Sequence, residues 1–150
     1  MRYANHILIA GLVVAALPLA GCSRKTSTYT KVEPAKIEHA KDSQITRITL
    51  TEQAMQRLGV KTAPLQEGKV QGDEKAAPRP FVPDSAVMYV ANGDTYVYTS
   101  PNPRTFVRHE VDVDYIKGGV AVLKKGPPTG THVVTIGAAE LFGTEFGVGH

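Results

Sequence analysis

The stretch AVMYV-ANGD-TYVYT, residues 86–99, decides which fold the sequence predicts. Two runs rich in β-branched and aromatic residues flank the dipeptide Asn92-Gly93. Such runs favour β-strands, and Asn-Gly between them is the strongest short signal for a β-hairpin. The dipeptide predicts a two-residue type I′ turn, in which both turn residues have positive φ. The stretch therefore predicts an antiparallel hairpin within the chain.

Further short strands follow the hairpin, separated by turns rich in glycine and proline. TFVRHEVDVDYI, residues 105–116, alternates apolar and polar side chains, as a strand with one buried face does. VAVL at 120–123 and HVVTIG at 132–137 predict two more strands, and AAELF at 138–142 predicts a helical turn. Phe106 falls on the polar side of the alternation, which the pattern does not explain. Short strands joined by tight turns indicate a small antiparallel barrel or sandwich.

The segment before the hairpin predicts one strand and one short helix. ITRITL, residues 45–50, has the alternation of a half-buried strand. Thr51 is a good N-cap for TEQAMQRL, residues 51–58, and Gly59 is placed to end that helix. The fold class we expect is therefore mainly β, a small antiparallel β-barrel or sandwich with this one short helix near residues 51–58.

An extended segment follows the helix. VKTAPLQEGKV, residues 60–70, predicts a second strand with Val60, Thr62 and Leu65 facing inward. GKVQGDEKAAPRP, residues 68–80, is rich in glycine, proline and charge, and it predicts a loop.

The N-terminus has the features of a lipoprotein signal. A basic start precedes a mostly apolar run at residues 7–20, which is shorter than the roughly 20 residues that span a bilayer. Leu19, Ala20, Gly21 and Cys22 resemble the bacterial lipobox position by position, and Cys22 is the only cysteine. The resemblance implies attachment of diacylglycerol to Cys22 and cleavage before it. We therefore expect a protein anchored in the lipid bilayer through Cys22, facing the periplasm or the cell surface.

Three parts are expected along the chain. Residues 1–21 form the signal peptide, residues 22–44 a lipid-anchored flexible tether, and residues 45–148 one β-rich domain. The tether is polar, mixed in charge and without a sustained apolar period. The formal net charge of +3 at pH 7 is too small to favour nucleic acid as a partner. With a single cysteine, no internal disulfide can form.

No combination of reactive side chains indicates an enzyme. His109 and His132 lie in separate predicted strands, and their spacing is not that of a metal site. Glu110, Asp112 and Asp114 share one strand face, which fits calcium binding or an acid pair, but such a row is more often a solvated face. No serine lies in a G-x-S-x-G motif. We expect no catalytic residue, metal or cofactor, with a small hydrolase as the distant alternative.

Several segments resemble one domain of a known family, the periplasmic adaptor subunits, which are the membrane fusion proteins of tripartite efflux pumps. In the order of the family's membrane-proximal domain, the segments are VPDSAV at 82–87, a hairpin with YVY at 96–98, FVRHEVDV at 106–113 and GPPTGTHVVTIG at 126–137. The segment ITLTEQAMQRLGVKTAPLQEG at 48–68 resembles the entry into such adaptors. Full adaptors carry a β-barrel, a lipoyl-like domain and a helical hairpin where this chain has only residues 69–80.

The resemblance implies docking rather than export. In the family, this domain packs against the extracytoplasmic part of an inner-membrane transporter. The chain is thus expected to be a non-catalytic docking or accessory module for a transporter. Arg104, Lys124 and Lys125, in turns that we expect to be exposed, are the expected contact residues because their charge can steer toward an acidic partner. The alternative is an envelope-binding lipoprotein that contacts cell-wall polymer or another surface protein. The sequence leaves the oligomeric state open.

Replacing Cys22 with Ala is expected to abolish lipid attachment and normal processing, because the thiol that carries the diacylglycerol is removed. Cell fractionation should show that the variant is lost from the membrane fraction. A variant that is still processed normally and still fractionates with membranes would contradict the lipoprotein assignment.

Overall fold

A computed structural model describes residues 33–39, 46–70 and 77–147 of the chain. The lipobox and Cys22 lie outside these ranges, so the lipid anchor stays a prediction. No helix in the described ranges is long and apolar enough to cross a membrane.

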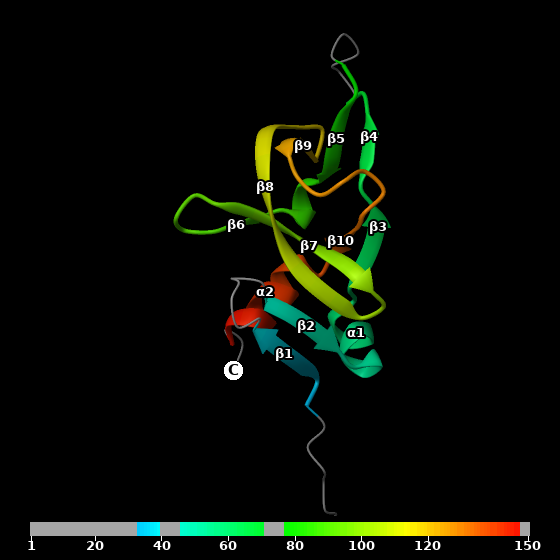
Figure 1. Cartoon of the computed structure of the whole chain (residues 1–150), viewed down its shortest axis with the longest axis vertical. Helices are drawn as coiled ribbons and strands as arrows, with labels where there is room; N and C mark the ends of the chain where they lie inside the picture. Colours follow the sequence, from blue (N-terminus) through cyan, green and yellow to red (C-terminus); the bar gives the residue numbers. More distant parts are fainter. Residues whose placement is uncertain (1–32, 40–45, 71–76, 148–150) are drawn as a thin grey trace, which may run out of the picture. The chain divides into compact units, whose positions relative to one another are not determined.

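Ten strands, two α-helices and one 3₁₀ turn make up the described part of the chain (Figure 1). The strands are β1 (Ala35–His39), β2 (Thr46–Leu50), β3 (Lys61–Pro64), β4 (Gln66–Gly68), β5 (Arg79–Pro83), β6 (Met88–Tyr89), β7 (Thr95–Asn102), β8 (Thr105–Lys117), β9 (Val120–Lys125) and β10 (His132–Ile136). The helices are α1 (Glu52–Leu58) and α2 (Ala138–Phe146), and the 3₁₀ turn is η1 (Asp84–Ala86).

The strands form one curled antiparallel sheet whose two ends are joined at Leu65. The strand order is β3-β10-β7-β8-β9-β5-β4, with β2 and β6 added beside β8 and β7, and β1 beside β2. Although β3 and β4 are the two ends of this order, Leu65 alone separates them along the chain. Leu65 donates its N–H to Thr131 O (2.8 Å), and its carbonyl accepts from Gly130 N (2.9 Å). The predicted mainly β, barrel-like fold is confirmed.

Two hydrophobic clusters lie on opposite faces of the β7–β8 hairpin. Successive side chains of a strand point to opposite faces, and the consecutive residues Val97 and Tyr98 are both fully buried. The inner core, within the curl, consists of Leu65, Val82, Ala86, Val87, Val97, Val111, Ala121, Leu123 and Val133. The outer core, beneath the helices and β2, consists of Ile48, Leu50, Ala54, Val60, Tyr98, Phe106, Val134, Ala138 and Leu141. Full burial of each large apolar side chain stabilises the fold by about 1.5–3 kcal/mol.

The second face explains Phe106. β2 pairs with the first part of β8, where Ile48 lies opposite Phe106, and both side chains are fully buried in the outer core. The expectation of one buried and one solvated face is therefore wrong for this part of β8. Further along, register shifts on both sides of Val113 accompany the pairing of β8 with β9.

The β6–β7 hairpin forms as predicted, but its turn is not type I′. Among the described residues, Arg104 is the only non-glycine residue with positive φ, so Asn92 does not have the predicted conformation. Gly93 has a φ of 93°, and its N–H donates to Val90 O at 2.9 Å. The loop therefore has three residues and ends in a glycine with positive φ. Asn92 acts through its side chain, because its Oδ1 accepts from Asp94 N at 3.1 Å.

Helix α1 matches its sequence signals. Thr51 caps it by accepting a hydrogen bond from Ala54 N on its side-chain oxygen at 3.1 Å, and Gly59 ends it with a φ of 62°. In the segment that follows, Val60 and Leu65 are buried as predicted, but Thr62 is exposed, which corrects its expected inward orientation. Among the described strands, β3 pairs only with β10, so Thr62 lies on a strand at the edge of the sheet.

Both ends of the described domain contain more structure than predicted. Residues 35–39, assigned to the tether, form β1 and pair with β2, so the ordered part begins before residue 45. The sequence hides this strand because AKIEH has a single large apolar residue and is mostly exposed. Helix α2 extends to Phe146 instead of ending after one turn, because Leu141 and Glu145 continue its buried face.

Replacing Gly93 with Val is expected to destabilise the protein by about 1–3 kcal/mol, because a β-branched side chain strains a backbone with φ of 93°. An added Cβ meets no atom within 4 Å there, so the cost is conformational rather than steric. Ala91→Val in the same exposed turn, without positive φ, is the control. Equal urea midpoints for the two variants would contradict the turn geometry.

Candidate functional site

Arg104 lies in the tight turn between β7 and β8. It is exposed, its φ is 61°, and its carbonyl accepts a hydrogen bond from Leu50 N at 2.9 Å. This contact ties the turn to the end of β2 and holds a left-handed conformation that non-glycine residues seldom adopt. The backbone of this turn is held by strands β7 and β8 and by the hydrogen bond to β2. The Arg104 side chain therefore projects from a fixed backbone.

Lys124 and Lys125 end β9, and Lys124 belongs to a cluster that the sequence did not reveal. Lys124 Nζ lies 3.2 Å from Asp114 Oδ1, and Arg79 Nη2 lies 3.4 Å from Asp114 Oδ2. Arg79 also donates to Leu123 O at 3.2 Å, which fixes it across β9. We call Arg79, Asp114 and Lys124 the basic cluster; Lys125 lies outside it, opposite Asp112. One carboxylate between two cations leaves the cluster with a net positive charge.

The predicted contact residues do not form a single patch. β8 begins beside Arg104, and Lys125 lies opposite Asp112, seven residues further along β8. At about 3.3 Å per residue, the two places are separated by roughly 20 Å. The structure instead brings Arg79 to Lys124, a pairing that depends on the β5–β9 register. The approach of Arg79 to Lys124 could have been predicted only from the correct strand order, because no local motif encodes it.

The acidic row of β8 is interrupted by the same register shifts. Glu110 and Asp112 are exposed, whereas Asp114 is engaged by the basic cluster. Within residues 33–39, 46–70 and 77–147, no group of three metal-ligating side chains occurs. The row therefore supplies an ion-pair partner and solvated charges.

A buried polar cluster lies beneath α2 and was missed by the sequence analysis. Tyr98 donates its hydroxyl to Glu145 Oε2 at 2.5 Å, and Arg108 Nη2 lies 3.3 Å from Glu145 Oε1. The Glu145 side chain is only 2% exposed, and Oε1 receives no hydrogen bond although Arg108 balances its charge. Arg108 also stacks over the rings of Tyr96 (4.7 Å) and Phe146 (5.2 Å). We call Tyr98, Arg108 and Glu145 the α2 clamp.

The α2 clamp keeps Tyr98 protonated. Burial, followed by the hydrogen bond to Glu145, raises the Tyr98 pKa well above its ordinary value, while Arg108 acts in the opposite direction. The Tyr98 hydroxyl therefore stays protonated, and can donate to Glu145, up to a higher pH than the hydroxyl of an exposed tyrosine. The signal that could have found this cluster is the helical spacing of Ala138, Leu141 and Glu145.

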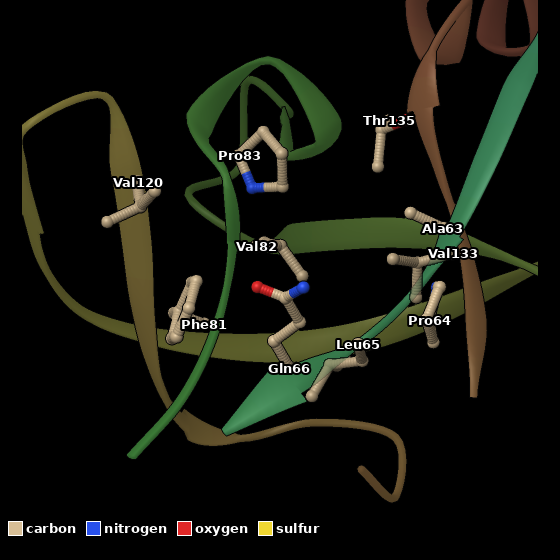
Figure 2. Close-up of a pocket in the computed structure, with 10 residues that line it drawn as sticks. All are labelled: Ala63, Pro64, Leu65, Gln66, Phe81, Val82, Pro83, Val120, Val133 and Thr135. Atoms are coloured by element: carbon tan, nitrogen blue, oxygen red, sulfur yellow. The ribbon is translucent and has the colours of Figure 1, made fainter. Parts of the chain in front are cut away.

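A shallow apolar hollow of about 280 Å³ lies at the seam of the curled sheet (Figure 2). It opens where β3 passes the end of β5, and both strands end in proline, which has no N–H to offer a ladder. Its lining is Ala63, Pro64, Leu65, Gln66, Phe81, Val82, Pro83, Val120, Val133 and Thr135. None of these side chains titrates, so the hollow offers apolar contact but no acid or base.

Comparison with known proteins adds a structural similarity. No protein-family model matches the sequence, and no curated protein matches it. The chain is similar to the NMR structure of a 180-residue fragment of SilB from Cupriavidus metallidurans CH34, which holds the N-terminal metal-binding site and the membrane-proximal domain of that protein. The sequence identity is 25% and the TM-score is 0.44. The similarity covers 59% of this chain and 48% of the SilB fragment.

Replacing Tyr98 with Phe is expected to lower the free energy of unfolding by about 1.5–3 kcal/mol, because the buried Glu145 carboxylate loses its donor. Tyr89→Phe is the matched control, since Tyr89 is half exposed and donates to Asp84 at 3.0 Å. Urea unfolding of both variants measures the difference. Equal losses would mean that the α2 clamp does not hold the helix.

The same variant has a pH signature. A raised folded-state pKa for Tyr98 means that its contribution to stability is complete below the unfolded tyrosine value of about 10 and is lost as pH rises above it. The parent should therefore lose stability above pH 10 more steeply than Tyr98→Phe does. Parallel curves would contradict the buried hydrogen bond.

Proposed function

We propose that this chain is a lipid-anchored extracytoplasmic protein that serves as a non-catalytic, adaptor-like docking or accessory module for a membrane transporter. The observation that carries the proposal is the set of four adaptor-like segments at 82–87, 96–98, 106–113 and 126–137. They supply the end of β5 with η1, and parts of β7, β8 and β10. These strands belong to one continuous sheet, so the resemblance concerns a folded unit rather than scattered turns.

The segment that resembles the entry into adaptors supports the same proposal. Residues 48–68 supply part of β2, α1, β3 and β4, and they close the curl at Leu65. Gly68 then pairs with Arg79 across β4 and β5. The two strands therefore meet side by side where full adaptors carry their additional domains. A unit built in this way needs none of those domains to complete its core.

The basic cluster is the proposed contact surface. Arg79 and Lys124 outnumber Asp114, and Lys125 follows at the exposed end of β9. The surface ion pairs within the cluster are weak because they are screened by solvent. Such charges steer an acidic partner and set its orientation more than they add affinity. The positive charge of the cluster favours an acidic extracytoplasmic domain of a transporter as the partner. Arg104 is a separate, second contact.

The anchor would place this surface near its partner. Twelve residues separate Cys22 from β1, and an acylated Cys22 would tie the chain to the membrane that carries the transporter. Confinement of both proteins to one membrane raises their effective concentration, so a weak docking interface is sufficient.

Cross-linking in intact cells, followed by mass spectrometry, tests the proposed partner. The double variant Lys124→Glu/Lys125→Glu should lose most cross-links to a transporter subunit, because the steering charge is reversed. Lys61→Glu makes the same kind of change on β3, which is not a neighbour of β9, and should keep them. Recovery of cell-wall material alone, or an equal loss in both variants, would favour the envelope-binding alternative.

A further inference from the structure

The outer edge of β1 has no partner strand among the described residues. β1 pairs with β2 from Ala35↔Leu50 to His39↔Thr46, and it pairs with no other described strand. Figure 1 shows β1 as the last strand on that side of β2. An edge of this kind presents backbone donors and acceptors that can pair with another strand.

The two faces of β1 differ sharply in chemistry. Ile37 lies opposite Ile48, so it shares the face of the outer core, yet 37% of Ile37 remains exposed. Lys36 and Glu38 share the other face and form an ion pair of 2.7 Å. Hydrogen bonding to Lys36 and the charge of Lys36 lower the Glu38 pKa.

The sequence of β1 is self-complementary in one antiparallel register. If Ile37 lies opposite Ile37 of a second copy, Lys36 lies opposite the second copy's Glu38, and Glu38 opposite its Lys36. If the register is centred on Lys36 instead, Lys36 lies opposite Lys36 of the second copy. If it is centred on Glu38, Glu38 lies opposite Glu38. Like charges directly opposite each other destabilise a strand pair, whereas opposite charges stabilise it.

Registers that differ by an odd number of residues are excluded by the orientation of the two faces of β1. They would place Ile37 opposite Lys36 or Glu38, and would put the outer-core face of one copy on the polar face of the other. Among the registers that keep both outer-core faces on one side of a continuous sheet, only the one centred on Ile37 also places opposite charges against each other.

We propose that two copies of this chain associate through β1, antiparallel and related by a two-fold axis at Ile37. The paired strands join two curled sheets, cover the exposed Ile37 of each copy with that of the other, and satisfy the edge of β1. A five-residue strand buries little area, so the dimer is weak in dilute solution and forms at high local concentration.

Charge reversal tests the register with full chains purified in detergent and measured by light scattering over a concentration series. Lys36→Glu and Glu38→Lys are each expected to remain monomeric, because each places like charges opposite one another. An equimolar mixture of the two should associate, since every Glu then faces a Lys. The double variant Lys36→Glu/Glu38→Lys should associate like the parent, and Lys61→Glu is the control outside the edge.

The mixture separates the proposal from a merely intramolecular role of the Lys36–Glu38 pair. Loss of that pair within one chain cannot be repaired by mixing two defective chains. A monomeric parent throughout the series, or a mixture that fails to associate, would overturn the proposal.

A cysteine at the two-fold axis gives a second readout. In the full chain with Cys22 retained, so that the anchor is intact, Ile37→Cys places a thiol at the two-fold axis, and mild oxidation in cells should yield a disulfide-linked dimer. Facing residues of an antiparallel pair have Cα atoms about 4.5–5.5 Å apart, within disulfide range. Lys36→Cys is the matched control, because its counterpart is displaced by two residues and lies beyond about 7 Å. Equal linkage of the two variants would contradict the register.

Discussion

The fold depends on the burial of the β7–β8 hairpin on both faces. Val97 and Tyr98 are neighbours in the chain, and each is fully buried in a different core. A hairpin of this kind cannot be stable alone, since each face needs a separate cover. β5, β9 and β10 cover one face by curling around it, whereas β2 and the two helices cover the other. The segment that carries β2 and α1 is therefore an integral part of the domain.

The cover on the outer face includes a polar element that is costly to bury. The side chain of Glu145 on α2 is buried, and its Oε1 atom receives no hydrogen bond. Arg108 and Tyr98 compensate the charge, and the same Arg108 is held between two aromatic rings. Removing one partner from a buried ionic cluster is more damaging than the net stabilisation from the intact cluster suggests. The position of α2 is thus specified by charge geometry as well as by Leu141.

Local signals in the sequence were sufficient for the fold class and for helix α1. Thr51 and Gly59 act through a short-range hydrogen bond and through backbone conformation. Both effects depend on residues close in the sequence, so a local pattern can predict them. The errors arose where distant segments decide the environment. Phe106 is buried because β2 arrives beside β8, and β1 forms because β2 offers it an edge. Likewise, Arg79 meets Asp114 and Tyr98 meets Glu145 through pairings that no local pattern encodes.

The single residue that joins the two ends of the sheet has a consequence for how the chain folds. Leu65 is bound by residues 130 and 131, and β3 pairs with β10, near the end of the chain. A chain synthesised from its N-terminus cannot close the curl until β10 has emerged. Until then, the edge of β3 that pairs with β10 and the apolar side chains of the inner core remain open to other chains. The topology therefore favours slow folding, because its closing contacts join segments far apart in the sequence.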